Sequence, residues 1–345
     1  MPAAHPIIPN HPIDPGWLAR HDEAVIAPDT PIIDAHHHLG DRPGWRYMVE
    51  DLATDLASGH NVVSTVYLEC GARYRSTGDA LLAPLGETEF VMAEIARPPA
   101  GHARLCEGMV MAADLQAGDG VQAVLDGHRE IAGPRLKGIR HSGVWHPRAV
   151  YHSPPRRAPG PEMFARSDFR AGLHRLQGSG LVFETWIFHT QLGALADLAR
   201  AFPDLVIVLD HIGHPTGEAG FGHGLVAALR DWRAALAPVA ACPNVRLKIG
   251  GMGMRTMGFD LRSGPAPRSS AELAAIWAPS VTTALEAFGP ERCMFESNFP
   301  VDKGACSYKV LWNAFKRLAA GLSRDEQADL FRRTAARTYG LAEPD

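Results

Sequence analysis

From Thr30 onward, short runs rich in β-branched and apolar residues alternate with longer segments that have a helical apolar period. Eight runs are predicted to be strands: 31–36, 61–69, 105–112, 135–141, 180–187, 205–210, 244–249 and 291–297. Helical patterns fall between or after them at 47–59, 86–97, 119–132, 168–178, 190–201, 224–240, 270–288, 305–319 and 323–338. Eight strands, each followed by a helix, are the count of an α/β fold of the (β/α)8 TIM barrel type, which the sequence therefore predicts.

Two strand candidates favour parallel strands that are covered on both faces. Residues 62–68 and 205–209 are nearly continuous apolar runs, whereas strands with one solvated face alternate. A doubly wound open sheet is the alternative, but it would need a glycine-rich phosphate-binding turn after an early strand, and the sequence has none there. Residues 1–29 are expected to be an N-terminal arm before a barrel at 30–345, because six prolines prevent a regular helix or a central strand.

Composition excludes several classes of protein. A chain of 345 residues with 46% hydrophobic content can bury a large core, and a net charge of −4 gives no indication of a nucleic-acid or membrane partner. No apolar run approaches the ~20 residues that span a bilayer. The five cysteines are scattered and never in C-x-x-C spacing, so we expect a cytoplasmic protein that acts on a small molecule. The sequence leaves open whether the chain forms a homo-oligomer.

Two loops are longer than a barrel requires. They cover residues 142–167 and 250–269, and both follow predicted strands. In a TIM barrel such loops lie at the C-terminal mouth, where these enzymes keep their active sites. Long ordered loops at that face are more often lids or substrate walls than connections without a role.

Three consecutive histidines, residues 36–38, lie at the end of the first predicted strand. Because side chains alternate along a strand, His36 and His38 should point the same way and His37 the opposite way. Two imidazoles side by side at the end of a buried strand suit a metal ion or a proton-transfer site. An affinity tag is the trivial alternative, but only three histidines occur and they lie well inside the chain.

Most of the other predicted strands also carry ionisable or aromatic side chains at or near their C-terminal ends. In chain order these are Glu69, Arg140, His141, Glu184, Trp186, His211, Lys248 and Glu296. Ionisable groups that converge at one mouth form a site where burial and mutual charge shift their pKa values. Arg140 would suit a substrate carboxylate, and Trp186 an apolar or sugar-stacking wall. Lys248 would contact substrate or pair with a carboxylate across the barrel.

These motifs resemble the amidohydrolase superfamily, in the branch of metal-dependent TIM-barrel hydrolases that includes sugar lactonases and 2-pyrone-4,6-dicarboxylate lactonase. The resemblance runs through residues 33–38, 136–141, 209–213, 244–248 and 288–300 and so covers nearly everything from 30 to 341. It implies the barrel fold and the hydrolysis, by activated water, of a lactone or similar carboxylic ester of a small acidic or sugar-derived substrate. It also places His36 and His38 on the first metal-ligand pair and His211 on the strand-6 histidine.

The last strand departs from the family pattern. Where the family usually has Gly-Ser-Asp-Trp-Pro, this chain has Glu-Ser-Asn-Phe-Pro, so Asn298 replaces the aspartate that serves as metal ligand or general base. An amide cannot accept a proton at neutral pH and is a weak ligand. Glu296, two residues earlier on the same face, is the first candidate for the missing carboxylate, and Asp302 is the second.

A second departure concerns the fifth strand, where this branch lacks the histidine of better-known members. Trp186 falls near that place and His189 is close but out of phase, so both are candidate substrate contacts, and Glu184 offers a carboxylate ligand instead. With Glu184 or Glu296 as the third ligand beside the two strand-1 histidines, the site would hold one divalent ion, zinc or manganese.

A metal-independent route also stays open. In that route His36, His38, Arg140 and His141 stabilise the oxyanion while a carboxylate activates water. Two other functions remain alternatives to a lactonase-like hydrolase. One is a metal-dependent non-oxidative decarboxylase of the same superfamily, and the other is a catalytically inactive binding barrel, which Asn298 motivates.

Overall fold

A computed structural model describes residues 5–6, 10–42, 45–97, 101, 103–150 and 159–343. Eight parallel strands form one sheet in which each strand pairs with its neighbours in chain order. They are β2 (Ile32–His37), β5 (Val62–Leu68), β6 (Arg104–Ala112), β7 (Leu136–Arg140), β9 (Val182–Thr185), β10 (Ile207–Leu209), β11 (Val245–Ile249) and β12 (Cys293–Phe295). The first and last strands meet where the His38 N–H donates to the Phe299 carbonyl at 2.8 Å, so the sheet is a nearly closed barrel and the predicted fold is confirmed.

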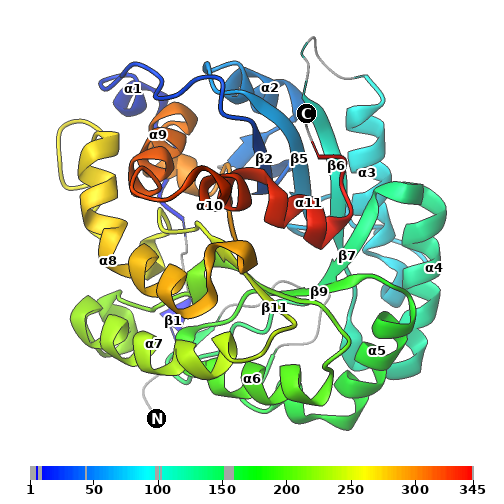
Figure 1. Cartoon of the computed structure of the whole chain (residues 1–345). Helices are drawn as coiled ribbons and strands as arrows, with labels where there is room; N and C mark the ends of the chain where they lie inside the picture. Colours follow the sequence, from blue (N-terminus) through cyan, green and yellow to red (C-terminus); the bar gives the residue numbers. More distant parts are fainter. Residues whose placement is uncertain are drawn as a thin grey trace.

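Most of the helices surround the strands and cover their outer face, whereas α11 (Thr334–Tyr339) lies across one end of the barrel (Figure 1). These helices are α2 (Val49–Leu56), α3 (Leu85–Ile95), α4 (Val121–Ala132), α5 (Ser167–Gly178), α6 (Leu192–Ala201), α7 (Leu225–Ala240), α8 (Ser270–Phe288), α9 (Tyr308–Leu318), α10 (Arg324–Ala328) and α11. A capping box between Ser269 and Glu272 begins α8, and Gly289 at φ 76° ends it. Among the described residues, no helix combines the length and the apolar character needed to cross a membrane.

The barrel interior is apolar at one end and charged at the other. At the N-terminal end of the strands, α11 packs against a small apolar cluster of Ile33, Ala35, Val66, Leu68, Val110, Val182, Val208 and Met294. Val182, Val208 and Met294 of this cluster are each followed, two residues later, by a buried acid. These acids are Glu184, Asp210 and Glu296. Since side chains two apart on a strand share a face, these acids enter the barrel directly above the apolar plug.

The N-terminal arm corrects one expectation. Pro15–Leu18 form one helical turn, α1, which Asp14 caps by accepting a hydrogen bond from the Trp17 N–H at 2.9 Å. Proline is tolerated at the first helical position because its missing N–H would have had no partner there. The expectation that prolines exclude every regular helix from the arm was therefore wrong for this turn.

Short strands lie around the mouth. In the arm, β1 (His5–Pro6) pairs in parallel with β8 (Ala149–Val150) in the loop after β7, and β3 (Gly40–Arg42) pairs with β4 (Trp45–Tyr47). Of the predicted long loop at 142–167, residues 151–158 lie outside the described residues. The other predicted loop, at 250–269, is described throughout and follows β11.

Candidate active site

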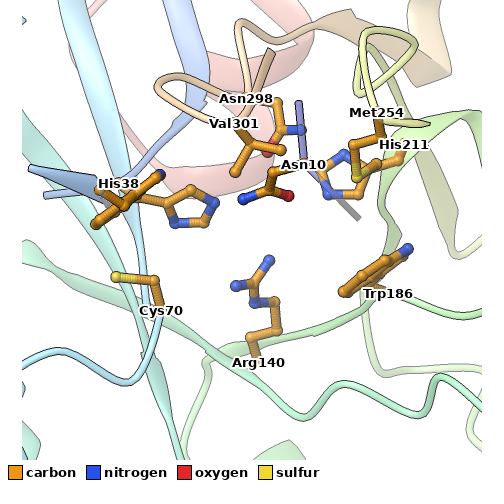
Figure 2. A pocket seen from close by; sticks show the side chains of 10 residues that line it. Asn10, His38, Cys70, Arg140, Trp186, His211, Met254, Asn298 and Val301 are labelled. Carbon is orange, nitrogen blue, oxygen red and sulfur yellow. The ribbon is translucent and has the colours of Figure 1, made fainter. Parts of the chain in front are cut away.

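A cavity of about 180 Å³ lies at the C-terminal ends of the barrel strands. Its lining residues are Asn10, His38, Trp45, Cys70, Arg140, Trp186, His211, Met254, Asn298 and Val301. Figure 2 shows His38, Arg140, Trp186 and His211 arranged around the cavity, although they come from four different strand ends. The predicted convergence of strand-end residues therefore occurs for these four side chains.

His36 and His38 lie side by side, as their spacing indicates. Their Nε2 atoms are 3.2 Å apart, while His37 turns away and contacts the Thr65 hydroxyl. The strand register shifts between Asp34 and His37, and such irregularities re-aim side chains at strand ends. The Leu68 carbonyl lies 2.8 Å from His38 Nδ1, so this nitrogen carries the proton and the Nε2 lone pair of His38 is available to a cation.

Glu296 lies between two histidines beneath the cavity. One carboxylate oxygen is 2.7 Å from His211 Nδ1 and also accepts the His211 backbone N–H at 3.1 Å. The other oxygen is 2.7 Å from His36 Nδ1, but the angle between the two groups does not suit a hydrogen bond. Burial raises the pKa of Glu296 to about 8, and the nearby Lys248 ammonium opposes this rise. The carboxylate is thus placed to hold the His211 ring in one orientation.

Two glycines after β11 make this packing possible. A Cβ at Gly250 would overlap Glu296 Cγ, and one at Gly251, which has φ 65°, would lie 2.6 Å from the His211 ring. Only glycine fits a position that combines positive φ with such close approach. The Gly-Gly pair in the sequence is the signal that a side chain must lie directly against this loop.

Lys248 and Glu184 form a fully buried ion pair below His36. Their Nζ and Oε1 atoms are 2.5 Å apart, and the Tyr339 hydroxyl donates to the other Glu184 oxygen at 2.6 Å. Lys248 Nζ also lies 3.4 Å from His36 Nδ1. Lys248 does not line the cavity, so the structure supports its role as a partner across the barrel rather than as a substrate contact. Tyr339, at the end of α11, was not anticipated from the sequence.

Arg140 lines the cavity and is held by two acids. Its Nε donates to Glu69 Oε1 at 2.9 Å, and one terminal nitrogen lies 3.3 Å from Asp210 Oδ2. The same nitrogen is 3.4 Å from His36 Nε2. Burial and the neighbouring Glu184 raise the pKa of Asp210, another residue that the sequence analysis did not single out.

Asn298 and Asp302 form a second polar pair at the mouth. Asn298 lines the cavity, and its amide nitrogen donates to Asp302 Oδ1 at 2.9 Å. The Gly253 N–H donates to the other Asp302 oxygen at 2.9 Å, and burial raises the pKa of Asp302 to about 8. Asn298 adopts φ 53°, which asparagine tolerates better than most residues. Asp302 lies behind Asn298 rather than in the cavity lining.

The structure does not bring two predicted substrate-binding residues to the cavity. His141 Nδ1 accepts the Leu115 N–H at 3.1 Å, and its ring packs edge-on against Phe169 of α5, on the outer side of the barrel. His189 Nδ1 accepts the Thr216 N–H at 3.3 Å, and its ring lies beside that of His223 rather than in the cavity lining. His141 lies one residue past the inward-facing Arg140, where strand alternation turns it outward, and His189 lies beyond the end of β9 at the start of a 3₁₀ turn, where that alternation no longer applies.

The site fits a divalent metal ion. Among the described residues, two groups of three have ligand atoms within 4.8 Å of one another: His36, His211 and Glu296, and His36, Glu184 and Asp210; neither includes His38. One oxygen of Glu296 and one of Asp210 are buried without a hydrogen-bond partner among the described residues, an arrangement that a cation would relieve. The 3.2 Å between the histidine Nε2 atoms is close to the roughly 3.3 Å expected for two ligands of one tetrahedral zinc.

Protonation favours the same conclusion. Burial and the Lys248 charge lower the pKa of His36, and burial together with Arg140 lowers the pKa values of His38 and His211. Metal ligation requires neutral imidazole, so no proton has to leave before an ion is bound. General-base catalysis has the same requirement.

Comparisons with known proteins agree with this geometry. The sequence profile of the family described as amidohydrolase matches residues 33–341. An L-fucono-1,5-lactonase from Burkholderia multivorans is 31% identical over 321 residues, which cover 90% of this chain and 97% of that protein. A protein from Sinorhizobium fredii is 31% identical over 335 residues, 90% of this chain and 99% of its own length. A crystal structure of a Burkholderia multivorans amidohydrolase with bound zinc has TM-score 0.69 and 26% identity, and covers 91% of this chain and 100% of that one.

Proposed function

Since the chain belongs to the amidohydrolase family, we propose that this enzyme hydrolyses a lactone, or a similar ester, of a small acidic or sugar-derived compound. The observation that carries the proposal is the convergence of His38, Arg140 and His211 on one cavity above the buried Glu296. A polar floor and a small volume suit a ring of sugar size, and the lactonase named among the relatives supports an ester bond as the target.

His211 is the proposed general base. Glu296 accepts a hydrogen bond from the Nδ1–H of the ring, so Nε2 is the nitrogen left to accept a proton from water that attacks the lactone carbonyl. The same nitrogen then returns the proton to the ring oxygen of the lactone as the C–O bond breaks. This use of a carboxylate to orient a histidine follows the logic of a catalytic triad without its nucleophile.

Arg140 and Trp186 are the proposed substrate contacts. Arg140 is positively charged and fixed by Glu69 and Asp210, so it offers a preorganised donor to the oxygen that gains charge in the transition state, or to a substrate carboxylate. The Trp186 ring forms an apolar wall, with its N–H directed to His214 at 2.8 Å and therefore turned away from substrate.

His36 and His38 are the residues proposed to hold zinc or manganese through their adjacent Nε2 atoms, and Glu296, which faces the other nitrogen of His36, would have to turn toward them to serve as the acidic ligand. Such an ion, when bound, polarises a carbonyl and lowers the pKa of water. Glu184 is the alternative acidic ligand, but its two oxygens already accept from Lys248 and Tyr339, which favours Glu296.

A lactone panel tests the proposal. Purified enzyme is mixed with L-fucono-1,5-lactone, other aldonolactones and pyrone carboxylates, and acid release is followed with an indicator. We expect turnover of at least one lactone and a loss of about 100-fold in His211→Asn, the range for removing a general base. Circular dichroism verifies that the variant folds. Absence of turnover across the panel, together with CO₂ release from a hydroxybenzoate, would favour the decarboxylase alternative.

A further inference from the structure

The N-terminal arm contributes a residue to the cavity. Asn10 is among the lining residues, and Figure 2 shows its side chain pointing into the cavity toward Arg140, between His38 and His211. We propose that Asn10 is a specificity-determining residue that recognises a hydroxyl group on the substrate ring. This inference rests on the proposed function, and it adds that the substrate is a hydroxylated ring held between the barrel floor and the arm.

The arm is anchored on two sides of the mouth. Before Asn10, β1 pairs with β8 in the loop that follows β7. After it, the chain packs against the loops that follow β11 and β12. The Gly304 position allows no side chain here, because a Cβ would overlap the His11 carbonyl oxygen and lie 2.8 Å from His11 Cβ. The arm is therefore in direct contact with the rim of the barrel on the β12 side.

Further contacts fix the segment that follows. The Trp17 indole N–H donates to the Gly264 carbonyl at 3.3 Å, and the Arg262 guanidinium lies 3.9 Å from the centre of the Trp17 ring. Arg20 donates to the Pro265 carbonyl at 2.9 Å. These contacts attach the arm to the long loop after β11, so the position of Asn10 over the cavity is determined by packing on both sides.

The chemistry of a carboxamide defines what it recognises. It offers two N–H donors and one carbonyl acceptor without charge, which matches a hydroxyl that both donates and accepts. Arg140 supplies the charged floor of the cavity opposite Asn10, and the neutral rings of His38 and His211 lie on either side (Figure 2). A substrate whose carbonyl faces this charged floor would present the hydroxyls of its ring to Asn10. A lactone without hydroxyls would gain nothing from that contact.

A labelling experiment tests the placement of the arm independently of catalysis. Cys70 lines the cavity, whereas the other four cysteines are buried, so a bulky thiol reagent reports access to the cavity. Gly304→Ala must push the arm away at His11 and should speed Cys70 labelling by at least about threefold, because local opening exposes the site. Gly321→Ala is the matched control, since nothing lies within 4 Å of a Cβ there, and Cys70→Ser gives the blank. Equal labelling rates in both alanine variants, with equal melting temperatures, would overturn the placement.

Kinetics test the recognition itself. Asn10→Ala should lower the ratio of kcat/KM for L-fucono-1,5-lactone over that for δ-valerolactone by about tenfold, the value of one hydrogen bond. A merely structural role would lower both activities equally and leave the ratio unchanged, which would refute the assignment. If the wild-type enzyme hydrolyses no lactone of the panel, the proposed function fails, while the labelling result still decides whether the arm covers the cavity.

Discussion

The histidines near the mouth of the barrel fall into two groups with different partners. The inner group consists of His36, His38 and His211, and three buried carboxylates lie among or below its members. The outer group consists of His146, His189, His214 and His223. Its hydrogen-bond partners are the Trp186 indole, the Thr216 hydroxyl and backbone N–H groups, and no carboxylate hydrogen-bonds to it within the described part of the chain.

The difference indicates that buried acids, rather than histidines alone, distinguish the proposed active site. His211 and His214 belong to one short motif, yet the turn that joins them has positive φ at four successive residues and sends the two rings to different partners. His211 faces Glu296, and His214 accepts the Trp186 N–H. A carboxylate next to an imidazole fixes its tautomer and strengthens it as a ligand or base. The outer group lacks that support.

The largest expected effect comes from removing an inner histidine. His38→Ala should lower kcat/KM by about a thousandfold, which corresponds to about 4 kcal/mol of transition-state stabilisation. It should also lower the zinc or manganese content of protein purified without chelator, measured by elemental analysis. His189→Ala, which removes a buried outer histidine, is the matched control. Full metal content and activity in His38→Ala would show that the inner histidines are no more important for metal binding and catalysis than the outer ones.

A carboxylate-to-amide exchange should have the next largest effect. Glu296→Gln keeps the size of the side chain but replaces the carboxylate with an amide, a weaker partner for His211 Nδ1, so kcat should fall about 100-fold. Asp302→Asn is the comparison, because Asp302 was the second candidate for the missing acid and lies behind Asn298. We expect about a tenfold loss or less there. If Asp302→Asn is the more damaging change, Asp302 rather than Glu296 is the functional acid.

Sequence alone predicted the barrel and the inner histidine pair because both depend on local patterns. Strand and helix periods fix the order of the elements, and a two-residue spacing fixes the common side of His36 and His38. His141 was misplaced because it lies one residue past Arg140, where alternation turns the side chain outward to Phe169. The sequence contained that alternation, but the strand end made its phase ambiguous.

Other parts of the site could not be read from the sequence because they depend on tertiary contacts. Tyr339 reaches Glu184 from the last helix, 155 residues away in the chain. Asn10 reaches the cavity from an arm in which the prolines gave no indication of a functional contact. Glycines 250 and 251 offered a local signal, since each must accommodate a neighbouring side chain, but the identity of that neighbour needed the fold.

A smaller effect on activity is expected when a histidine of the outer group is replaced. His189→Asn should change kcat/KM by less than about threefold, because the ring does not line the cavity. Its cost should appear in stability instead, as about 1–2 kcal/mol, since Thr216 loses a buried acceptor. Urea unfolding measures this cost. A large loss of activity without a loss of stability would place His189 in the active site after all.

The smallest expected effect is a pH dependence of stability that His189 contributes. Burial lowers its pKa from 6.5 to about 4, so the folded protein keeps the ring neutral while the unfolded chain protonates it. The contribution to stability is therefore present above pH 6.5 and declines as the pH falls toward 4, by about 0.7 kcal/mol between pH 7 and 6. Comparing urea unfolding of wild type and His189→Asn at these two pH values isolates the contribution of His189 to the pH dependence of the unfolding free energy. Identical pH slopes in both proteins would mean that the ring titrates normally and that water reaches the outer group as readily as it reaches an exposed histidine.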